Sequence, residues 1–520
     1  MGRCSAKLYT FFVTLVVSSQ PLIAGLKETL PTYHWAYQHM EELRVRGFFS
    51  ELNFAKQPFT RGEVARALVD HLIAGWAVDD IPKAVYLLDE LYEDFAEEMN
   101  LLRRDESSDI FSIGLLTQAN IGNDGKETDD SESFRINGGF QVGEEFGVYN
   151  TMNFDSDLSK DTTFAGRKWR GMSAFTEQGY MQYESDRFSV LIGRDFKRWG
   201  IGKRGTLLIS DYSRPMDQLS TELRIGFVEL SFIAAELDRV DGMRRFLSAH
   251  RVDINLNNSL NIGISELLIY GGVNASPVAA FTNPALVFHG ENLNNASQSN
   301  TFGSIDVLWY PKRNWQFSGA ILIDDIQLDN KTLEDLEPNE IGMIVGVHRA
   351  NPFGIDGSDS WVEYVRITNR TYTTLNVEET LKHRNRSIGY LLGNDFDSKE
   401  FGVSAWVIKG LKISSALTFI RDGEGGIDVP FSTPWTDVDE EGNFLYTVER
   451  GYTEPFPTGV VQKFTEFNFS AERSFSSKFR VTFDYVHIAI DNLGHVVGVS
   501  KSDDKFFLRM WYDFKYSLNL

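Results

Sequence analysis

Residues 506–519 place an apolar side chain at every second position. Successive side chains of a β-strand point to opposite faces, so the segment has the pattern of a strand with one apolar face. That face spans about a dozen residues and carries aromatic rings at both ends, which is enough to cross a bilayer when the strand is tilted. A half-buried strand of a soluble sheet alternates in the same way, so the alternation alone leaves the location open. The apolar positions are Phe506, Leu508, Met510, Tyr512, Phe514, Tyr516 and Leu518, and the polar ones include Arg509, Asp513, Lys515, Ser517 and Asn519.

The period of two begins near residue 110, and the connections between the expected strands alternate in length. We expect the last three strands at 462–473, 479–490 and 506–520. A short SFSSK turn joins the first two, a longer loop at 491–505 joins the next pair, and a long segment at 421–461 precedes them. Outer-membrane barrels have short periplasmic turns and long external loops. About 410 residues at roughly 20 to 25 residues per strand predict 16 to 18 strands.

The N-terminus has the form of a secretory signal, which predicts export. Arg3 and Lys7 precede an apolar run from Leu8 to Val17, and small residues follow at Ala24 and Gly25. We expect cleavage after Ala24; the apolar run is shorter than the roughly 20 residues of a membrane-spanning helix. The chain's one cysteine, Cys4, lies inside this signal, so we expect a mature chain without disulfides or thiolate metal sites.

Composition excludes a helical membrane protein but leaves a membrane β-barrel open. Aromatic residues reach 13%, and no second uninterrupted apolar stretch of about 18 residues follows the signal. The lipid face of a barrel is visible only as alternation, which this sequence has. The soluble alternative is a periplasmic sandwich that binds carbohydrate.

Residues 31–104 have helical rather than strand periodicity. We expect a helix ended by Gly47, a second helix capped by Thr60 with Glu63 as its capping-box partner, and a third from Pro82 through Arg104. The segment resembles an S-layer-homology module in one copy, on the residues His34-Trp35-Ala36, Gly47 and Thr60-Arg61-Gly62-Glu63. Two roles stay open: a helical plug or periplasmic cap, and a glycan or peptidoglycan contact through Trp35 and Arg61.

A basic cluster interrupts an acidic chain. Five Arg or Lys residues fall among the twelve positions from Arg194 to Gly205, whereas the whole chain has a net charge of −22. That charge repels phosphate backbones, so we exclude nucleic acid as a partner. Two readings of the cluster stay open: an ion-pair lattice that rigidifies the lumen, or a cationic track that binds an acidic polymer while Trp199 stacks on its sugars. The candidate residues are Arg194, Asp195, Lys197, Arg198, Trp199, Lys203, Arg204, Asp211, Arg214 and Asp217.

The stretch GRDFKRWGIGKRGTLLISDYSRPMD at 193–217 resembles the signature of the Wzi-type capsule-assembly outer-membrane proteins. In that family Gly-Arg-Asp, Arg-Trp-Gly and a Leu-Leu-x-Ser-Asp…Pro run end one strand and begin the next; here Ile201 replaces the proline usual after Trp-Gly. Further similar runs, in the family's order, are NPALVFHGENLN at 283–294, LIDDIQLDN at 322–330, YLLGNDFDSKEF at 390–401 and FIRDGEGGID at 419–428. The resemblance implies an 18-stranded barrel with a periplasmic helical bundle, acting as a surface lectin that holds polysaccharide at the outer membrane.

Enzyme, cofactor and metal signals are absent from the sequence. It has no GxSxG, HExxH or phosphate-binding glycine loop, and adjacent carboxylates such as Asp324 and Asp325 point to opposite faces of a strand. The acidic segment 421–461 lacks the spacing of an EF-hand loop, so we expect a solvated loop and no defined metal site.

These observations predict an all-β membrane barrel of about 16–18 antiparallel strands with a small N-terminal α-helical domain. We expect a signal peptide at 1–24, a periplasmic helical domain at 25–108 and an outer-membrane barrel at 109–520. The predicted function is to bind or organise surface polysaccharide, expected to be acidic, as a monomer among outer-membrane lipids and without a cofactor. The alternative with the same fold is a porin or solute channel with a helical plug; the two differ in whether the lumen conducts.

Overall fold

The computed structural model describes residues 25–74, 83–104, 109–123, 128–161, 164, 166–278, 281, 283, 285–295, 299–327 and 331–519. The expected signal peptide at 1–24 and the expected helix start at Pro82 lie outside these residues. No helix in the described ranges is long and apolar enough to cross a membrane. The helices of at least one full turn are α2 (Ala36–Val45), α3 (Arg61–Ala74), α4 (Ala84–Asp94), α5 (Ala96–Arg104), α6 (Asp157–Lys160) and α7 (Phe288–Asn295).

The N-terminal helices begin and end largely where the sequence predicted. Gly47 adopts a φ of +99° directly after α2, a conformation that favours glycine. The capping box at the start of α3 is confirmed: the Thr60 backbone N–H donates to Glu63 Oε2 at 2.8 Å, and the Glu63 N–H donates to Thr60 Oγ1 at 3.1 Å. The single third helix was wrong, because Phe95 leaves helical geometry and divides it into α4 and α5. The Phe95 ring is fully buried under the Arg61 guanidinium, and this packing overrides local helix propensity.

Eighteen long antiparallel strands, counted over the described residues, close into one barrel. Closure joins the first strand to the last, from Ile110 opposite Asn519 to Asn123 opposite Phe506. The strands are β2 (Ile110–Asn123), β3 (Thr128–Val142), β4 (Phe146–Asp155), β6 (Met172–Glu184), β7 (Phe188–Asp195), β9 (Met216–Ile225), β10 (Val228–Val240), β11 (Met243–Leu256), β12 (Leu260–Gly272), β13 (Ser299–Trp309), β14 (Trp315–Asp325), β15 (Glu340–Ala350), β16 (Ser358–Ile367), β19 (Phe396–Ile408), β20 (Leu411–Asp422), β21 (Gln462–Ser476), β22 (Phe479–Asp491) and β23 (Ser500–Asn519). The two-residue strand β5 (Lys168–Trp169) pairs with β6 in the barrel sheet. Four other two-residue strands form two separate sheets: β1 (Lys56–Gln57) with β8 (Arg198–Trp199), and β17 (Lys382–His383) with β18 (Arg386–Ser387).

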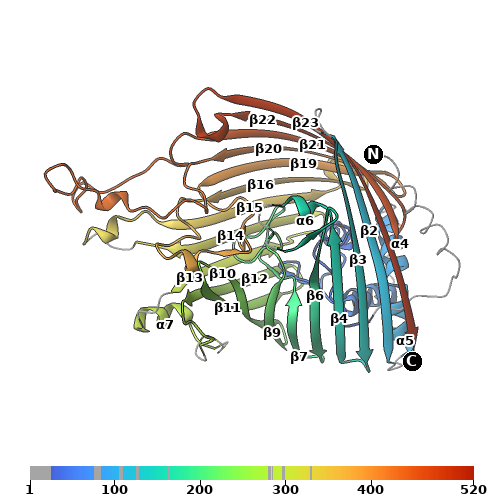
Figure 1. Cartoon of the computed structure of the whole chain (residues 1–520). Coiled ribbons are helices and arrows are strands. Elements are labelled where there is room, and N and C mark those ends of the chain that lie inside the picture. Colours follow the sequence, from blue (N-terminus) through green and yellow to red (C-terminus); the bar gives the residue numbers. More distant parts are fainter. Residues whose placement is uncertain are drawn as a thin grey trace.

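The barrel has a short-turn end and a long-loop end. Figure 1 shows α4 and α5 at one end, near the C-terminus, while α7 and the loop 423–461 extend from the other. The alternation of short and long connections predicted from the last strands is confirmed, but the loop expected at 491–505 is only 492–499, because β23 begins at Ser500. The last strand therefore extends further toward the long-loop end than its apolar face does. Its added residues pair with β22 from Asp491 opposite Ser500 onward.

The outer face of the barrel is apolar, and the inner face divides into two sectors. On β10 to β16 many inward side chains are apolar and buried, so we call this side the apolar sector. They pack in one continuous cluster with the N-terminal helices; examples are Ile233, Leu247, Leu267, Phe302, Leu322 and Ile344. On β2 to β4 and β20 to β23 the inward side chains are mostly polar or charged, so we call this side the polar sector; examples are Gln118, Arg135, Glu472, Arg480 and Asp513.

One loop covers part of the outer wall near the long-loop end. Phe232, Phe246 and Tyr270 point outward from β10 to β12 but are buried beneath Phe281 and Phe288 of the loop 273–298. The backbone N–H of Phe288, at the start of α7, donates to the Glu266 carboxylate of β12 at 2.8 Å. This loop contains the sequence run NPALVFHGENLN, and Leu286 and Phe288 of that run pack against the outside of the barrel.

The lipid-facing position of the outward side chains gives a test of the barrel in a membrane. Val345 lies in the middle of β15, points outward and is 50% exposed. We expect Val345→Arg to lower the free energy of unfolding by about 2 to 4 kcal/mol, as for a cation near the bilayer midplane. Urea titration in lipid vesicles measures the change. Val497→Arg is the matched control, because Val497 is 75% exposed in the loop 492–499. Equal stability of the two variants would contradict a lipid-facing Val345.

Candidate functional site

The basic cluster lies on a loop that folds into the barrel. The loop 196–215 joins β7 to β9, and its short strand β8 pairs with β1 from the N-terminal segment. In this pairing Trp199 lies opposite Lys56, and the Gly200 N–H donates to the Ala55 carbonyl at 2.8 Å. Gly202 makes the turn after it: its φ is +134°, and a Cβ there would lie 2.1 Å from the Gly205 carbonyl oxygen. The loop is therefore fixed against the helical segment.

The cluster residues do not converge on one open surface. The Asp195 carboxylate is buried and accepts a hydrogen bond from Gln178 Nε2 at 2.8 Å. Every cation of the cluster lies beside a carboxylate, which is the arrangement of an ion-pair lattice and leaves no row of unpaired cations. The pairs are Arg194 with Asp217 (2.6 Å), Lys197 with Glu222 (3.5 Å), Arg198 with Asp211 (3.4 Å), Lys203 with Glu41 (3.8 Å), Arg204 with Glu466 (3.1 Å) and Arg214 with Asp161 (2.8 Å).

Trp199 cannot act as the expected sugar platform in this conformation. Its side chain has no exposed surface, and it belongs to the apolar cluster that joins the helices to the barrel wall. Stacking on a sugar needs an accessible ring face. The sequence suggested an exposed ring because charged residues surround Trp199 along the chain; in space, apolar side chains such as Ile209 surround it.

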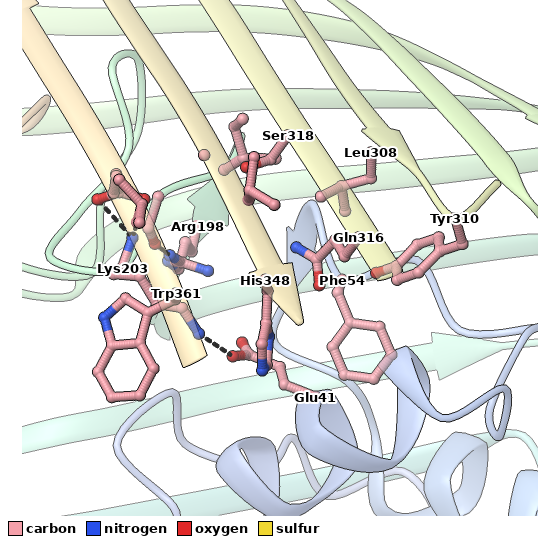
Figure 2. Close-up of a pocket in the computed structure, with 16 residues that line it drawn as sticks. Glu41, Phe54, Arg198, Lys203, Leu308, Tyr310, Gln316, Ser318, His348 and Trp361 are labelled. Atoms are coloured by element: carbon pink, nitrogen blue, oxygen red, sulfur yellow. Dashed lines mark hydrogen bonds and ion pairs between the residues drawn. The ribbon is translucent and has the colours of Figure 1, made fainter. Parts of the chain in front are cut away.

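A small cavity lies beside Lys203 and Arg198, between the loop and the wall (Figure 2). The Lys203 backbone N–H donates to both Glu363 oxygens, at 3.1 and 2.9 Å, and the Lys203 ammonium lies 5.6 Å from the centre of the Trp361 ring. The cavity measures about 60 Å³, below the roughly 300 Å³ at which ligand pockets begin. The sequence did not single out Trp361. An aromatic residue in an alternating strand is equally typical of the lipid-facing aromatic girdle and of the inner wall.

The two candidate glycan contacts of the helical segment have different surroundings. Arg61 is buried, forms ion pairs with Glu98 and Asp94, and has its pKa raised by those carboxylates against the opposing effect of burial. It is a core residue of the helices and offers no surface to a glycan. Trp35 instead stacks against the Arg480 guanidinium, 3.8 Å from its ring centre, and lines a cavity inside the barrel.

Two larger cavities remain. The loop-end cavity measures about 330 Å³ and lies between the loops 368–395 and 423–461, with Arg370, Phe431 and Tyr452 in its lining. Arg370 holds Glu454 through two hydrogen bonds, at 2.8 and 3.0 Å. The lumen cavity measures about 500 Å³ and lies between the start of α2 and the polar sector. Among the residues that the structure describes, no group of His, Cys, Asp or Glu could hold a metal ion.

The family model of the capsule assembly protein Wzi matches residues 114–433, which is 320 of the 520 residues. The chain belongs to the Wzi capsule assembly family. The match begins in β2 and ends in the loop 423–461, so it includes the basic cluster and one side of the loop-end cavity. No curated protein shows significant sequence similarity to this family member.

Solved structures share the barrel. The structure of Wzi from Escherichia coli, described as a carbohydrate-binding β-barrel involved in group 1 capsule assembly, has a TM-score of 0.59 at 14% identity, covering 95% of this chain and 99% of that one. The outer-membrane protein OpdK of Pseudomonas aeruginosa has a TM-score of 0.46 at 8% identity, covering 78% and 99%. OprD of the same organism has a TM-score of 0.45 at 8% identity, covering 79% and 94%. The family and the 18-stranded fold place the chain in the outer membrane.

Buried ion pairs anchor the helical segment to the wall. Arg46, which directly follows α2 and is fully buried, donates to both oxygens of Asp359 on β16, at 3.1 and 2.8 Å. Glu42 pairs with Lys412 of β20 and accepts a hydrogen bond from the Trp406 indole at 2.9 Å. Burial alone would raise the pKa of Glu42, but the Lys412 ammonium and the Arg46 guanidinium lower it to about 2. Glu42 is therefore a carboxylate at neutral pH.

Removing the Glu42 charge should destabilise the barrel. We expect Glu42→Gln to cost about 3 to 5 kcal/mol, because it leaves the buried Lys412 ammonium without its partner. Thermal unfolding in detergent, followed by the change in gel mobility, measures the effect. Asp89→Asn is the control: Asp89 pairs with Lys409 at 2.6 Å, but both are exposed, so its loss should cost at most about 1 kcal/mol. Similar losses in both variants would contradict the anchoring role.

Acid should loosen the same segment. Burial lowers the pKa of His34 to about 3, so the neutral ring contributes stability above the ordinary pKa of histidine, about 6.5, and that contribution falls as pH drops below it. The lowered pKa of Glu42 adds a contribution that is present above about pH 4.3 and is lost as pH falls toward about 2. We therefore expect the unfolding temperature to fall from pH 7 to pH 3, with the Glu42 part of the decline absent in Glu42→Gln. A flat pH profile would contradict both assignments.

Proposed function

We propose that this chain binds polysaccharide at the cell surface and holds it there without altering it chemically. The observation that carries the proposal is the apolar packing that fills one side of the lumen. One apolar cluster extends from the N-terminal helices through the loops 196–215 and 368–395 to the inner wall of the apolar sector. Because this packing narrows the lumen, the barrel is better suited to binding a ligand than to conducting solutes. Membership of the Wzi family, and the description of the Escherichia coli protein as carbohydrate-binding, support the same class of ligand.

The loop-end cavity is the place we propose for first contact with the polymer. Its volume falls within the range of ligand pockets, and its lining combines the rings of Phe431 and Tyr452 with polar groups such as Asn369 and Thr373. Aromatic rings pack against the C–H faces of sugars, while amides and hydroxyls bond to sugar hydroxyls. The Arg370 guanidinium is held by Glu454 and lies 5.0 Å from the centre of the Trp435 ring, so the cavity is preformed by contacts between two loops.

The charge of the polymer, the monomeric state and a peptidoglycan contact stay predictions. The paired cations of the cluster do not add support for an acidic ligand. The buried position of Arg61 does not add support for peptidoglycan. The proposal therefore depends on recognition of sugar hydroxyls and sugar faces, and it applies to neutral and acidic polymers alike.

Deleting the gene tests the proposal directly. In cells that make a surface polysaccharide, we expect the deletion to lower the cell-bound fraction of the polymer and to raise the fraction in the medium, with total synthesis unchanged. Sugar analysis of cells and supernatant measures both fractions. An unchanged cell-bound fraction would contradict the proposal.

Two phenylalanines of the same loop refine this experiment. Phe431 lines the loop-end cavity, whereas Phe444 is 48% exposed in the same loop and outside the cavity lining. We expect Phe431→Ala to reduce retention, with a loss of about 0.5 to 1.5 kcal/mol of binding free energy, which is the size of one aromatic contact. Phe444→Ala should retain polymer like the parent. Equal retention by both variants would contradict a polymer contact in the loop-end cavity.

A further inference from the structure

The lumen cavity, of about 500 Å³, is a second place that fits a ligand. Its floor is the start of the helical segment, with Tyr33, Trp35 and Gln38. Its walls are strands of the polar sector, with Gln118 on β2 and Trp511 on β23. Most inward residues here are polar, so the apolar packing that fills the other side of the barrel reaches the cavity lining only at Trp35.

The lining has the chemistry of a sugar site. Three aromatic rings meet at the floor, where Tyr33 lies edge-on to Trp511 with ring centres 6.3 Å apart. Cross-strand neighbours supply amides and hydroxyls: Gln118 lies opposite Ser133, and Asn120 lies opposite Ser131. Among the described residues, the buried indole N–H groups of Trp35 and Trp511 and the buried side-chain Oδ1 of Asn120 have no hydrogen-bond partner. Hydroxyl groups both donate and accept, so they match such a mixed lining.

The charged groups of the lining are already engaged. Arg480 is buried and pairs with Glu90 of α4 and with Glu472 at 2.9 Å. Arg509 pairs with Asp484 at 2.8 Å. Asp155 accepts the backbone N–H of Asp157 at 2.8 Å. Both arginines are paired with carboxylates, and Asp155 and Asp157 add negative charge to the lining. The cavity therefore offers no excess positive charge to a uronate or phosphate. An uncharged ligand fits this balance best.

The cavity reaches from the floor to the long-loop end. Asp157 begins α6 in the connection between β4 and β6, which is one of the long loops, and Gln38 belongs to α2. Both residues line the cavity and both are exposed. A chain end or a side branch of a surface polymer can therefore enter from the long-loop end and meet the aromatic floor.

We propose that the lumen cavity binds an uncharged sugar segment of the surface polysaccharide, with Trp511 and Trp35 beneath it and Gln118, Asn120 and Ser131 beside it. The proposal rests on the proposed function and adds a location and a charge class to it. It gives the helical segment a part in recognition, because Trp35 contributes to the floor of the site.

Site-directed cysteines test the proposal in the full-length protein. The chain has one cysteine, Cys4, in the expected signal, so a cysteine placed in the lumen reports its own accessibility. Ser131→Cys places a thiol in the lining, and Ser414→Cys places one on the inward face of β20, outside the lining. The probe is polysaccharide from the producing cells, cut to oligomers and separated by anion exchange into neutral and acidic fractions. The measurement is the rate of maleimide labelling in detergent.

We expect the neutral fraction to protect Ser131→Cys and to leave Ser414→Cys unaffected. At about ten times Kd the labelling rate should fall about tenfold, because only unoccupied protein reacts. Protection by the acidic fraction alone, equal protection of both positions, or no protection by either fraction would each overturn the proposal. If the gene deletion still lowers retention, the proposed function survives that result and only the lumen site fails.

A cavity-filling pair provides a second readout that does not depend on labelling. Thr482→Phe introduces a ring into the cavity from β22, whereas Ser414→Phe introduces the same ring outside it. A shift in gel mobility on heating, equal to that of the parent protein, shows that each barrel has folded. We expect Thr482→Phe to weaken binding of the neutral fraction at least about tenfold, because the added ring occupies ligand volume. Equal binding by the two folded variants would overturn the proposal.

Discussion

The structure depends on the closure of its sheet between β2 and β23. In a hydrocarbon environment every backbone N–H and C=O needs a partner within the protein, and a closed barrel provides this for all its strands. The ladder from Ile110 opposite Asn519 to Asn123 opposite Phe506 removes the two edges that an open sheet would expose. Closure also encloses a lumen wide enough to need contents of its own. The helical segment and two inward-folded loops supply them.

The helical segment and the inward loops fill the apolar sector of the lumen more completely than the polar sector. The apolar sector therefore serves stability, and the polar sector leaves room for a ligand. Against the apolar sector, the loops and helices form a packed core that includes Trp199 and Ile344. Against the polar sector, ion pairs such as Arg480 with Glu90 of α4 hold the helices while leaving a cavity open. One sector resembles the interior of a soluble domain, and the other resembles a binding cleft. A porin-like barrel would instead carry polar side chains around the whole lumen.

The sequence predicted what local periodicity and short-range chemistry determine. The alternation from Phe506 to Tyr516 and the alternation of short and long connections follow from chemistry within a few residues, and so does the capping box at Thr60. The inward fold of the loop 196–215 could not be predicted in the same way. The sequence around its charged residues is typical of a solvated loop. Their ion-pair partners, such as Glu466 and Glu41, are distant in the chain and are seen only in the structure. Trp199 was misjudged for the same reason, since its neighbours in space come from other elements.

The anchors of the helical segment also set an order of assembly. Arg46 pairs with Asp359 and Glu42 with Lys412, so these contacts join positions more than three hundred residues apart. Contacts of such sequence separation form late, because a long loop must close before they stabilise anything. The helical segment precedes the barrel strands in the chain, yet it is thus among the last parts to find its place. Until β20 has joined the sheet, Glu42 has no Lys412 to pair with. The helical segment is then not anchored, and the lumen cavity lacks the floor that Trp35 forms.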